Sequence, residues 1–274
     1  MRARLLAVAL VGLVAPICEA GPWATGRGHL YSKLSYQHKA SDQFAQPDGT
    51  IFDIPRFTQD DAFLYLAYGL SERVTLIASV PLVRSSDLDD SPDELTRASG
   101  FGDVQAGLQV QLGRAGPWVF AVRGTLQAPT GNETLSGGLQ ATGSGVWEAE
   151  SVLGAGRSLA RGKGYGFAEI GPYFRGGGLR DGLSYRTQLG WNLGRRVVAA
   201  GNLAGLQRWS DTPGELTADS LVGFGDGVTY AAWGPSLIVK FGAGWGAQAD
   251  WEALFHTRNI ATGDTWRIGL TYQR

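Results

Sequence analysis

The chain has 274 residues, with 24 basic and 25 acidic side chains and a formal net charge of −1. This balance argues against a nucleic-acid partner, whose binding surface needs an excess of Lys and Arg. Glycine occurs 41 times and tryptophan nine times, while only 18% of the residues are charged. Average domains contain less Gly and Trp and about 25% charged residues.

The first twenty residues have the features of a secretory signal peptide. A basic head with Arg2 and Arg4 precedes an uncharged run from Leu5 to Ile17, and small residues follow at Cys18 and Ala20. The run is shorter than the roughly 20 apolar residues that a spanning helix needs. We therefore expect residues 1–20 to be a signal peptide, and residues 21–274 to be an exported domain without cysteine.

Residues 103–112 alternate between two kinds of side chain. Val104, Leu108 and Leu112 share one face with two other apolar residues, and the opposite face carries Asp103, Gly107 and three glutamines. A period of two is that of a β-strand whose faces meet different environments. Soluble sandwiches and membrane barrels both show it, so this segment alone leaves both classes open.

The same alternation returns along the whole chain. It is found near residues 30–37, 62–70, 74–82, 104–112, 118–128, 147–155, 168–174, 183–193, 197–209, 230–241, 247–256 and 265–273. These segments make twelve expected strands. The contrast between faces is weak in residues 197–209 and 229–240, so ten or fourteen strands stay possible.

The connections alternate in length. Short turns are expected near residues 72, 114, 161, 195 and 243, and long polar connections at 39–59, 84–100, 129–145, 175–181, 210–226 and 257–264. Outer-membrane barrels have this arrangement, with small periplasmic turns and larger external loops. In lipid every backbone N–H and C=O must be paired internally, so a sheet there has to close on itself.

We therefore predict an all-β fold, a transmembrane antiparallel up-and-down β-barrel of about 12 strands in the bacterial outer membrane. Its partners would be outer-membrane lipid and, during biogenesis, the barrel assembly machinery. Aromatic residues near strand ends fit interfacial girdles: Tyr36, Tyr68, Trp118, Trp147, Trp191, Trp251 and Trp266. The alternative is a soluble secreted sandwich or a lipocalin-like barrel, whose apolar faces would meet in a core.

Charged residues on the polar faces would point into the lumen of such a barrel. The candidates are Lys33, Asp103, Arg123, Glu148, Glu150, Arg186, Asp250, Glu252 and Arg267. Buried charges must be paired or hydrated, because an isolated ion in a low dielectric is costly. These groups are either a network of ion pairs that fills the barrel or a selective lining for a solute. Gly102-Asp103 and Pro129–Gly131 are also expected to fix an external rim.

No pattern in the sequence indicates catalysis, a metal site or a cofactor. His29 and His38 flank the first expected strand and His256 ends the eleventh, so a metal site would need all three histidines to converge. The pairs Asp60-Asp61 and Asp89-Asp90 are similar to carboxylates of outer-membrane proteases, but such pairs are ordinary in solvated external loops. We expect no enzymatic activity and no cofactor.

Two segments resemble a known family. Residues 101–110, FGDVQAGLQV, and 126–132, LQAPTGN, are followed by Gly143-Ser-Gly145 and a strand containing Trp and Glu. Together they resemble the outer-membrane transporter family associated with the meta-pathway of phenol degradation. Tyr68–Leu76, followed by Val80-Pro81-Leu82, also fits its strand-turn-strand pattern. The resemblance covers about residues 60–160. The chain ends in Arg274, whereas many barrels end in phenylalanine.

The resemblance implies an outer-membrane barrel, often encoded near genes for the breakdown of aromatic compounds. With the lumen charges, it leads us to expect a channel that passes small solutes, aromatic or otherwise hydrophobic ones included, by passive diffusion. One alternative is a structural barrel that assists surface-polymer export or adhesion. Another is an outer-membrane enzyme acting on lipid or protein.

Overall fold

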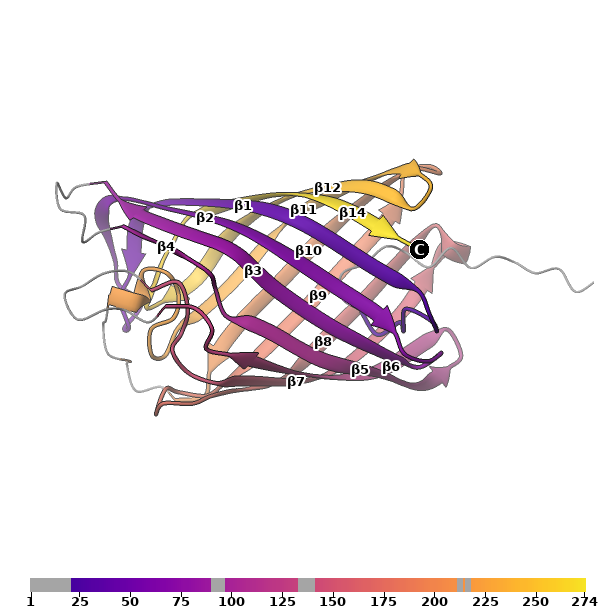
Figure 1. The fold of residues 1–274 in the computed structure, drawn as a ribbon, viewed down its shortest axis with the longest axis horizontal. Helices are drawn as coiled ribbons and strands as arrows, with labels where there is room; N and C mark the ends of the chain where they lie inside the picture. Colours follow the sequence, from indigo (N-terminus) through magenta and orange to yellow (C-terminus); the bar gives the residue numbers. More distant parts are fainter. Residues whose placement is uncertain (1–20, 90–96, 133–140, 211–213, 215–217) are drawn as a thin grey trace, which may run out of the picture.

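The computed structural model describes residues 21–89, 97–132, 141–210, 214 and 218–274, so the predicted signal peptide lies outside the described residues. Twelve antiparallel strands form one closed wall (Figure 1). They are β1 Leu30–Ala45, β2 Ile51–Gly69, β3 Val74–Leu88, β5 Val104–Ala115, β6 Trp118–Ala128, β7 Glu148–Leu159, β8 Gly164–Arg175, β9 Gly182–Asn192, β10 Val197–Arg208, β11 Thr229–Gly242, β12 Trp245–Arg258 and β14 Asp264–Gln273.

Strand β1 closes the barrel because it pairs with both of its neighbours. Tyr31–Ala40 pair with the last strand, β14, while Leu30–Ala45 pair with β2. No edge of the wall is left open at this seam, as a sheet in lipid requires. The predicted all-β barrel of about twelve strands is therefore confirmed.

Four short elements accompany the wall. Strand β4, Ala98–Gly100, pairs with β3, and β13, Ile260–Ala261, pairs with the end of β1. Two 3₁₀ turns, η2 at Ala160–Gly162 and η3 at Ala218–Ser220, complete the described elements. Among the described residues, no helix has the length and apolar character needed to cross a membrane.

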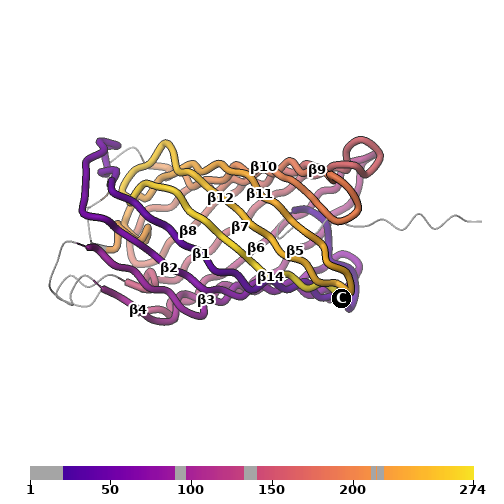
Figure 2. Tube along the Cα trace, turned by 90° about the horizontal axis from the view of Figure 1, so that it is seen from above, coloured from indigo at the N-terminus to yellow at the C-terminus, as the bar shows by residue number. Residues whose placement is uncertain are grey.

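The two ends of the barrel differ. Tight connections, such as the one between β5 and β6, lie at the end that also holds the C-terminus and the start of β1 (Figures 1 and 2). The opposite end carries the longer connections, including the one between β10 and β11. In outer-membrane barrels the short turns are periplasmic and the long loops extracellular, and we use these names for the two ends.

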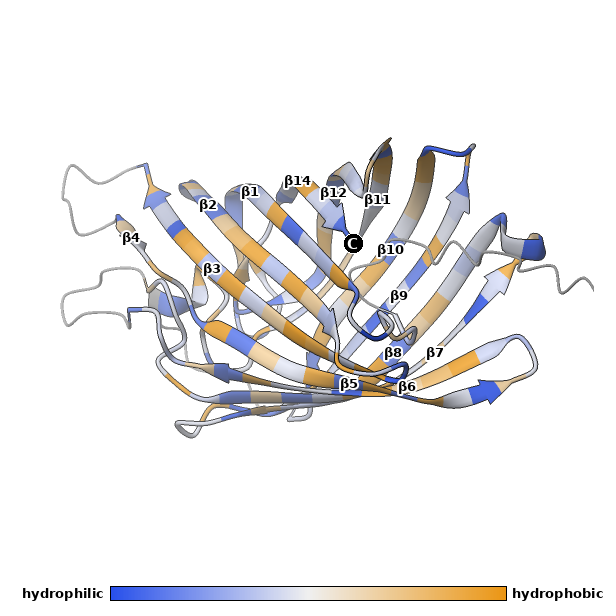
Figure 3. Cartoon of the chain, turned by 45° about the vertical axis from the view of Figure 1, so that its right-hand side comes forward, coloured by the Kyte–Doolittle hydropathy of each residue, from blue (hydrophilic) through white to orange (hydrophobic). Residues whose placement is uncertain are grey.

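The wall has an apolar outside and a largely polar inside. In β5 the outward Leu108 and Leu112 are exposed, whereas Gln109 faces inward and is buried. Apolar residues recur along the neighbouring strands in the same way (Figure 3). Six of the predicted girdle aromatics are exposed: Tyr36, Tyr68, Trp118, Trp147, Trp191 and Trp266. The outer face thus matches a hydrocarbon layer with aromatic borders.

Two expected connections are shorter than predicted. Residues 39–59 form most of an extended hairpin, in which only residues 46–50 connect β1 to β2, and β3 continues to Leu88 inside the expected 84–100 connection. These strands rise past the level of His38 and Asp60, where the apolar outer band ends. Above that level the inner face carries the buried Phe44 and Phe57 instead of polar groups, so the alternation that marks a membrane strand disappears.

Candidate functional site

The N-terminal residues lie inside the barrel, at its periplasmic end. We call residues 21–28 the floor segment. Gln109 of β5 donates to the carbonyl oxygens of Gly21 and Trp23 at 2.8 and 3.0 Å. The ring of Trp23 stands edge-on to Tyr165 and Phe167, with ring centroids 6.2 Å away in each case. With Val198 and Ile238, these rings form an apolar cluster across the lumen.

The extracellular end is crossed by part of the connection between β10 and β11. We call residues 218–228 the roof segment. Val222 belongs to an apolar cluster with Phe44, Phe57 and Ala261, which lie at the extracellular ends of β1, β2 and β13. Phe224 packs against this cluster and lies under the guanidinium of Arg84, whose Cζ is 4.9 Å from the ring centroid.

Polar contacts also fasten the roof segment. Arg175 of β8 donates to the carbonyl oxygens of Phe224 and Gly225, both at 2.8 Å. Asp226 forms an ion pair with Arg180. The roof is therefore tied by charged groups to β8 and to the connection between β8 and β9, and by apolar contacts to β1 and β2.

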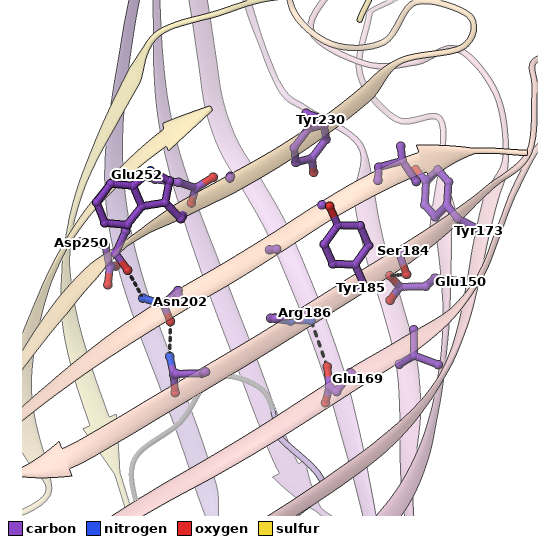
Figure 4. Close-up of a pocket in the computed structure, with 18 of the residues that line it drawn as sticks. Glu150, Glu169, Tyr173, Ser184, Tyr185, Arg186, Asn202, Tyr230, Asp250 and Glu252 are labelled. Atoms are coloured by element: carbon purple, nitrogen blue, oxygen red, sulfur yellow. Dashed lines mark hydrogen bonds and ion pairs between the residues drawn. The ribbon is translucent and has the colours of Figure 1, made fainter. Parts of the chain in front are cut away.

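A chamber of about 490 Å³ lies between floor and roof. Its lining includes four arginines and five carboxylates, most of them on β6–β12 (Figure 4). They are Arg123, Arg175, Arg186, Arg267, Glu148, Glu150, Glu169, Asp250 and Glu252. Such a volume suits a small molecule, although most ligand pockets are mainly apolar and this one is not.

Arg123 is the centre of one ion cluster. It donates to Glu150 at 3.2 Å and to Glu169 at 3.1 Å, and Arg186 reaches the same Glu169 oxygen at 3.4 Å. Ser184 also donates to Glu150 at 2.6 Å. The side chain of Arg123 is buried, whereas that of Arg186 is 39% exposed within the described structure. Arg186 is thus the guanidinium of this cluster that water or a solute can reach.

A belt of hydrogen-bonded side chains runs from strand to strand on the inner face of the wall, on the periplasmic side of the ion cluster. Tyr165 donates to Gln188, whose amide donates to Asn202 at 2.5 Å. Asn202 in turn donates to Ser236, and Ser236 donates to Asp250 (Figure 4). The belt joins β8, β9, β10, β11 and β12 through polar groups that face the lumen.

Lys33 continues the belt onto β1. Its Nζ lies 3.7 Å from Asp250, and its side chain is completely buried. A fully buried ammonium is tolerated because a carboxylate compensates its charge. The belt therefore ends on an ion pair that also joins the first strand to the rest of the wall.

Glu148 joins the chamber to the roof. Its carboxylate accepts from Arg175 at 2.8 Å, from Gln127 at 2.8 Å and from the hydroxyl of Tyr173. Gln127 also donates to Asp103 at 3.3 Å. A single chain of contacts thus runs from the external end of β5 to the roof segment.

The structure brings seven of the nine predicted lumen residues together around the chamber: Arg123, Glu148, Glu150, Arg186, Asp250, Glu252 and Arg267. Lys33 and Asp103 lie behind this lining and contact it through Asp250 and Gln127. Arg267 donates both Nε and Nη2 to the side-chain oxygen of Gln37.

Sequence reasoning missed Arg175, Tyr173 and the roof segment. Arg175 and Tyr173 share the inward phase of β8 with Glu169, so continuing the alternation of this strand would have found them. No comparable signal marks the roof, because a loop that folds inward has no fixed period.

The paired aspartates and the histidines are dispersed. Asp61 points inward and pairs with Arg84 at 2.6 Å, whereas Asp60 lies on the outer wall, 2.8 Å from His38. Asp89 follows β3, and Asp90 lies outside the described residues. Adjacent residues of a strand point to opposite faces, so Asp60 and Asp61 do not share a site.

No known protein-family model matches the chain, and no curated protein matches its sequence. Its fold is similar to that of the COG4313 outer membrane channel from Pseudomonas putida F1, with a TM-score of 0.63 and 17% identity over 90% of this chain and 95% of that chain. The KdgM porin is also similar, with a TM-score of 0.51 and 10% identity over 88% of this chain and 98% of that chain. The chain therefore has the fold of outer-membrane channels and porins, which supports the predicted outer-membrane location.

Proposed function

We propose that the protein is an outer-membrane channel for small solutes that combine an aromatic or apolar body with an ionised or hydrogen-bonding group. The observation behind this proposal is the charged chamber between the floor and roof segments. A purely apolar solute would gain little from a lining of ion pairs. A solute with a carboxylate or hydroxyl group could exchange hydrogen bonds with the chamber, while Tyr173 and Tyr230 offer aromatic surface beside it.

Arg186 is the residue we assign to solute contact. Its guanidinium is the most exposed one of the ion cluster. Guanidinium groups bind carboxylates bidentately. Passage would be passive, without a cofactor, and would require movement of the floor segment, the roof segment or both.

We also keep two expectations about biogenesis as proposals. Cleavage after Ala20 would leave Gly21, which lies at the floor, as the first residue of the mature chain. Insertion of the barrel would depend on the barrel assembly machinery.

One alternative has a specific observation in its favour. Because segments cross the lumen at both ends, a structural barrel that conducts nothing and assists polymer export or adhesion is the second candidate. An enzymatic role has no comparable support among the described residues.

Planar-bilayer recordings separate these functions. A channel gives discrete conductance steps, and Arg186→Gln should shift its ion preference toward cations because it removes a positive charge from the chamber. Benzoate should reduce the current more than acetate does at equal concentration, and Arg186→Gln should remove that difference. Arg195→Gln, in the turn after β9, is the matched control. A protein that inserts but never conducts would favour the structural barrel.

A further inference from the structure

The periplasmic end of the barrel carries an excess of positive charge. In residues 21–29 and in the five short connections between strands, Glu72 is the only acidic residue. The same segments contain six basic residues: Arg27, Arg73, Arg161, Lys163, Arg195 and Arg196. All six are exposed, and none forms an ion pair within the part of the chain that the structure describes. The charge of this rim is therefore left to be compensated by something outside the chain.

The outer wall also differs between its two membrane borders. At the extracellular border, the indole N–H of Trp251 donates to the carboxylate of Asp264 at 3.2 Å. At the periplasmic border, the ring of Trp118 lies under the guanidinium of Arg157, whose Cζ is 5.3 Å from the ring centroid. The polar partner of a border tryptophan is thus an anion at one leaflet and a cation at the other.

Arg157 is held in place with its hydrogen-bond donors unused. It has the outward phase of β7, like the exposed Leu153, and pairs across the sheet with Trp118, the first residue of β6. Its Nε is shielded from solvent, yet no described residue accepts a hydrogen bond from it. A cation–π contact orients a guanidinium without occupying its N–H groups. Because a shielded donor without an acceptor is costly, this position calls for an acceptor from outside the chain.

More cations lie close to Arg157 along the rim. Arg161 and Lys163 belong to the turn that follows β7, and both are exposed. On the other side, Ala115 pairs with Trp118, and the exposed Arg114 precedes it at the end of β5. An anion at Arg157 would therefore meet several positive charges at once.

The wall between Arg157 and the middle of the membrane suits a hydrocarbon chain. Gly166 pairs with Arg157, and Ala168 pairs with Ala155, so small residues form a strip on the outer face of β7 and β8. Large exposed apolar side chains border this strip: Phe120, Leu153, Ile170 and Leu189. An acyl chain can lie against the strip while its headgroup stays at the level of Arg157.

We propose that Arg157, together with Arg161 and Lys163, binds the phosphate of an anionic glycerophospholipid in the periplasmic leaflet of the outer membrane. Guanidinium groups bind phosphate oxygens bidentately, and clustered basic residues beside a membrane attract anionic headgroups. The acyl chain of the lipid follows the strip of small residues. The site lies on the outer wall, so it does not depend on the proposed channel.

Lipid titration followed by native mass spectrometry tests the site on the purified barrel. The probes are dioleoylphosphatidylglycerol and dioleoylphosphatidylcholine, which have the same acyl chains but an anionic and a zwitterionic headgroup. The parent should bind phosphatidylglycerol more tightly. Arg157→Gln should weaken that binding about tenfold, the loss expected for one hydrogen bond between charged groups. Arg157→Lys should lose less, because it keeps the charge and gives up only the bidentate geometry.

Two further variants define the site. Arg161→Gln combined with Lys163→Gln should weaken the binding of phosphatidylglycerol less than Arg157→Gln does, because both side chains are exposed and no ring orients them. Arg56→Gln is the matched control, since Arg56 is an exposed arginine at the extracellular end. It should leave the affinity for both lipids unchanged. Heat-dependent gel mobility confirms that each variant is folded.

Competitors distinguish the lipid from other sources of phosphate. Glycerol 3-phosphate has the phosphate but no acyl chain, so it should not displace phosphatidylglycerol, and displacement would reassign the site to a soluble phosphate compound. Lipid A that bound more tightly, with the same dependence on Arg157, would move the site to the outer leaflet. Equal affinity of the parent for both probes, or unchanged binding in folded Arg157→Gln, would also overturn the proposal.

Discussion

The floor and the roof obstruct the same lumen by different means. The floor segment is held by neutral contacts: the amide of Gln109 binds two of its carbonyl groups, and Trp23 packs on two aromatic rings. The roof segment is held largely by charge, through Arg175 and the Arg180–Asp226 ion pair. The strength of neutral packing barely depends on ionic conditions. The strength of a charged contact depends on every partner that compensates its charge.

This difference suggests separate tasks for the two ends. The roof shares Glu148 and Arg175 with the chamber, so a solute that competes for these groups acts on the roof as well. The floor shares no ion pair with the chamber lining among the described residues, and its release depends on loss of aromatic packing. The following variants probe that contrast.

Arg175→Met should have the largest effect. It leaves the Glu148 carboxylate without its guanidinium and frees two roof carbonyls, at a cost of about 4 kcal/mol. We expect the roof to become accessible, measured as chymotrypsin cleavage near Phe224 in the folded barrel. Arg196→Met, in a turn at the opposite end, should leave the cleavage rate unchanged. Equal rates in both variants would show that charge does not hold the roof.

Trp23→Ala should release the floor at a cost of about 3 kcal/mol, because the segment loses the only aromatic ring among its described residues 21–28. Single-channel conductance in planar bilayers should increase, while the roof keeps its resistance to chymotrypsin. Trp118→Ala on the outer wall is the control. Unchanged conductance would mean that the floor does not limit ion flow.

Lys33→Met should lower the stability of the barrel wall by about 3 kcal/mol, because it leaves the buried Asp250 carboxylate without the ammonium that compensates its charge. The midpoint of the heat-dependent gel shift should fall. Adding Asp250→Asn should recover part of the loss, because the amide carries no charge to compensate. A double variant whose gel-shift midpoint is no higher than that of Lys33→Met would contradict the role of this pair.

Asp60→Asn should have the smallest effect, below about 1 kcal/mol, because Asp60 and His38 are an exposed pair on the outer wall. The same gel-shift midpoint measures it. A loss as large as that of Lys33→Met would show that the outer pair lies in a less hydrated place than its exposure indicates.

Most of the wall could be predicted from the sequence because lipid outside and polar groups inside impose a strict period of two. Where the inside is apolar, that signal fades. Residues 197–209 show weak contrast because Val198 faces inward and packs in the floor cluster, and Ile238 does the same in residues 229–240. The weak strands thus mark where the floor lies.

The charges of the chamber were predictable as a set but not as pairs. Periodicity places Arg123, Glu169 and Arg186 on the inner face, yet which charges meet depends on the stagger between strands, which no local pattern encodes. The roof was beyond reach for a related reason. Its contacts join residues such as Arg175 and Phe224, which are 49 positions apart in the chain.

The floor segment also constrains the order of folding. It precedes the first strand in sequence, but its partners Thr75, Gln109 and Tyr165 belong to β3, β5 and β8. Its docking surface does not exist until those strands stand side by side, so these residues, which are synthesised before the strands, are among the last to find their place. Until then the nascent barrel has an unobstructed periplasmic mouth.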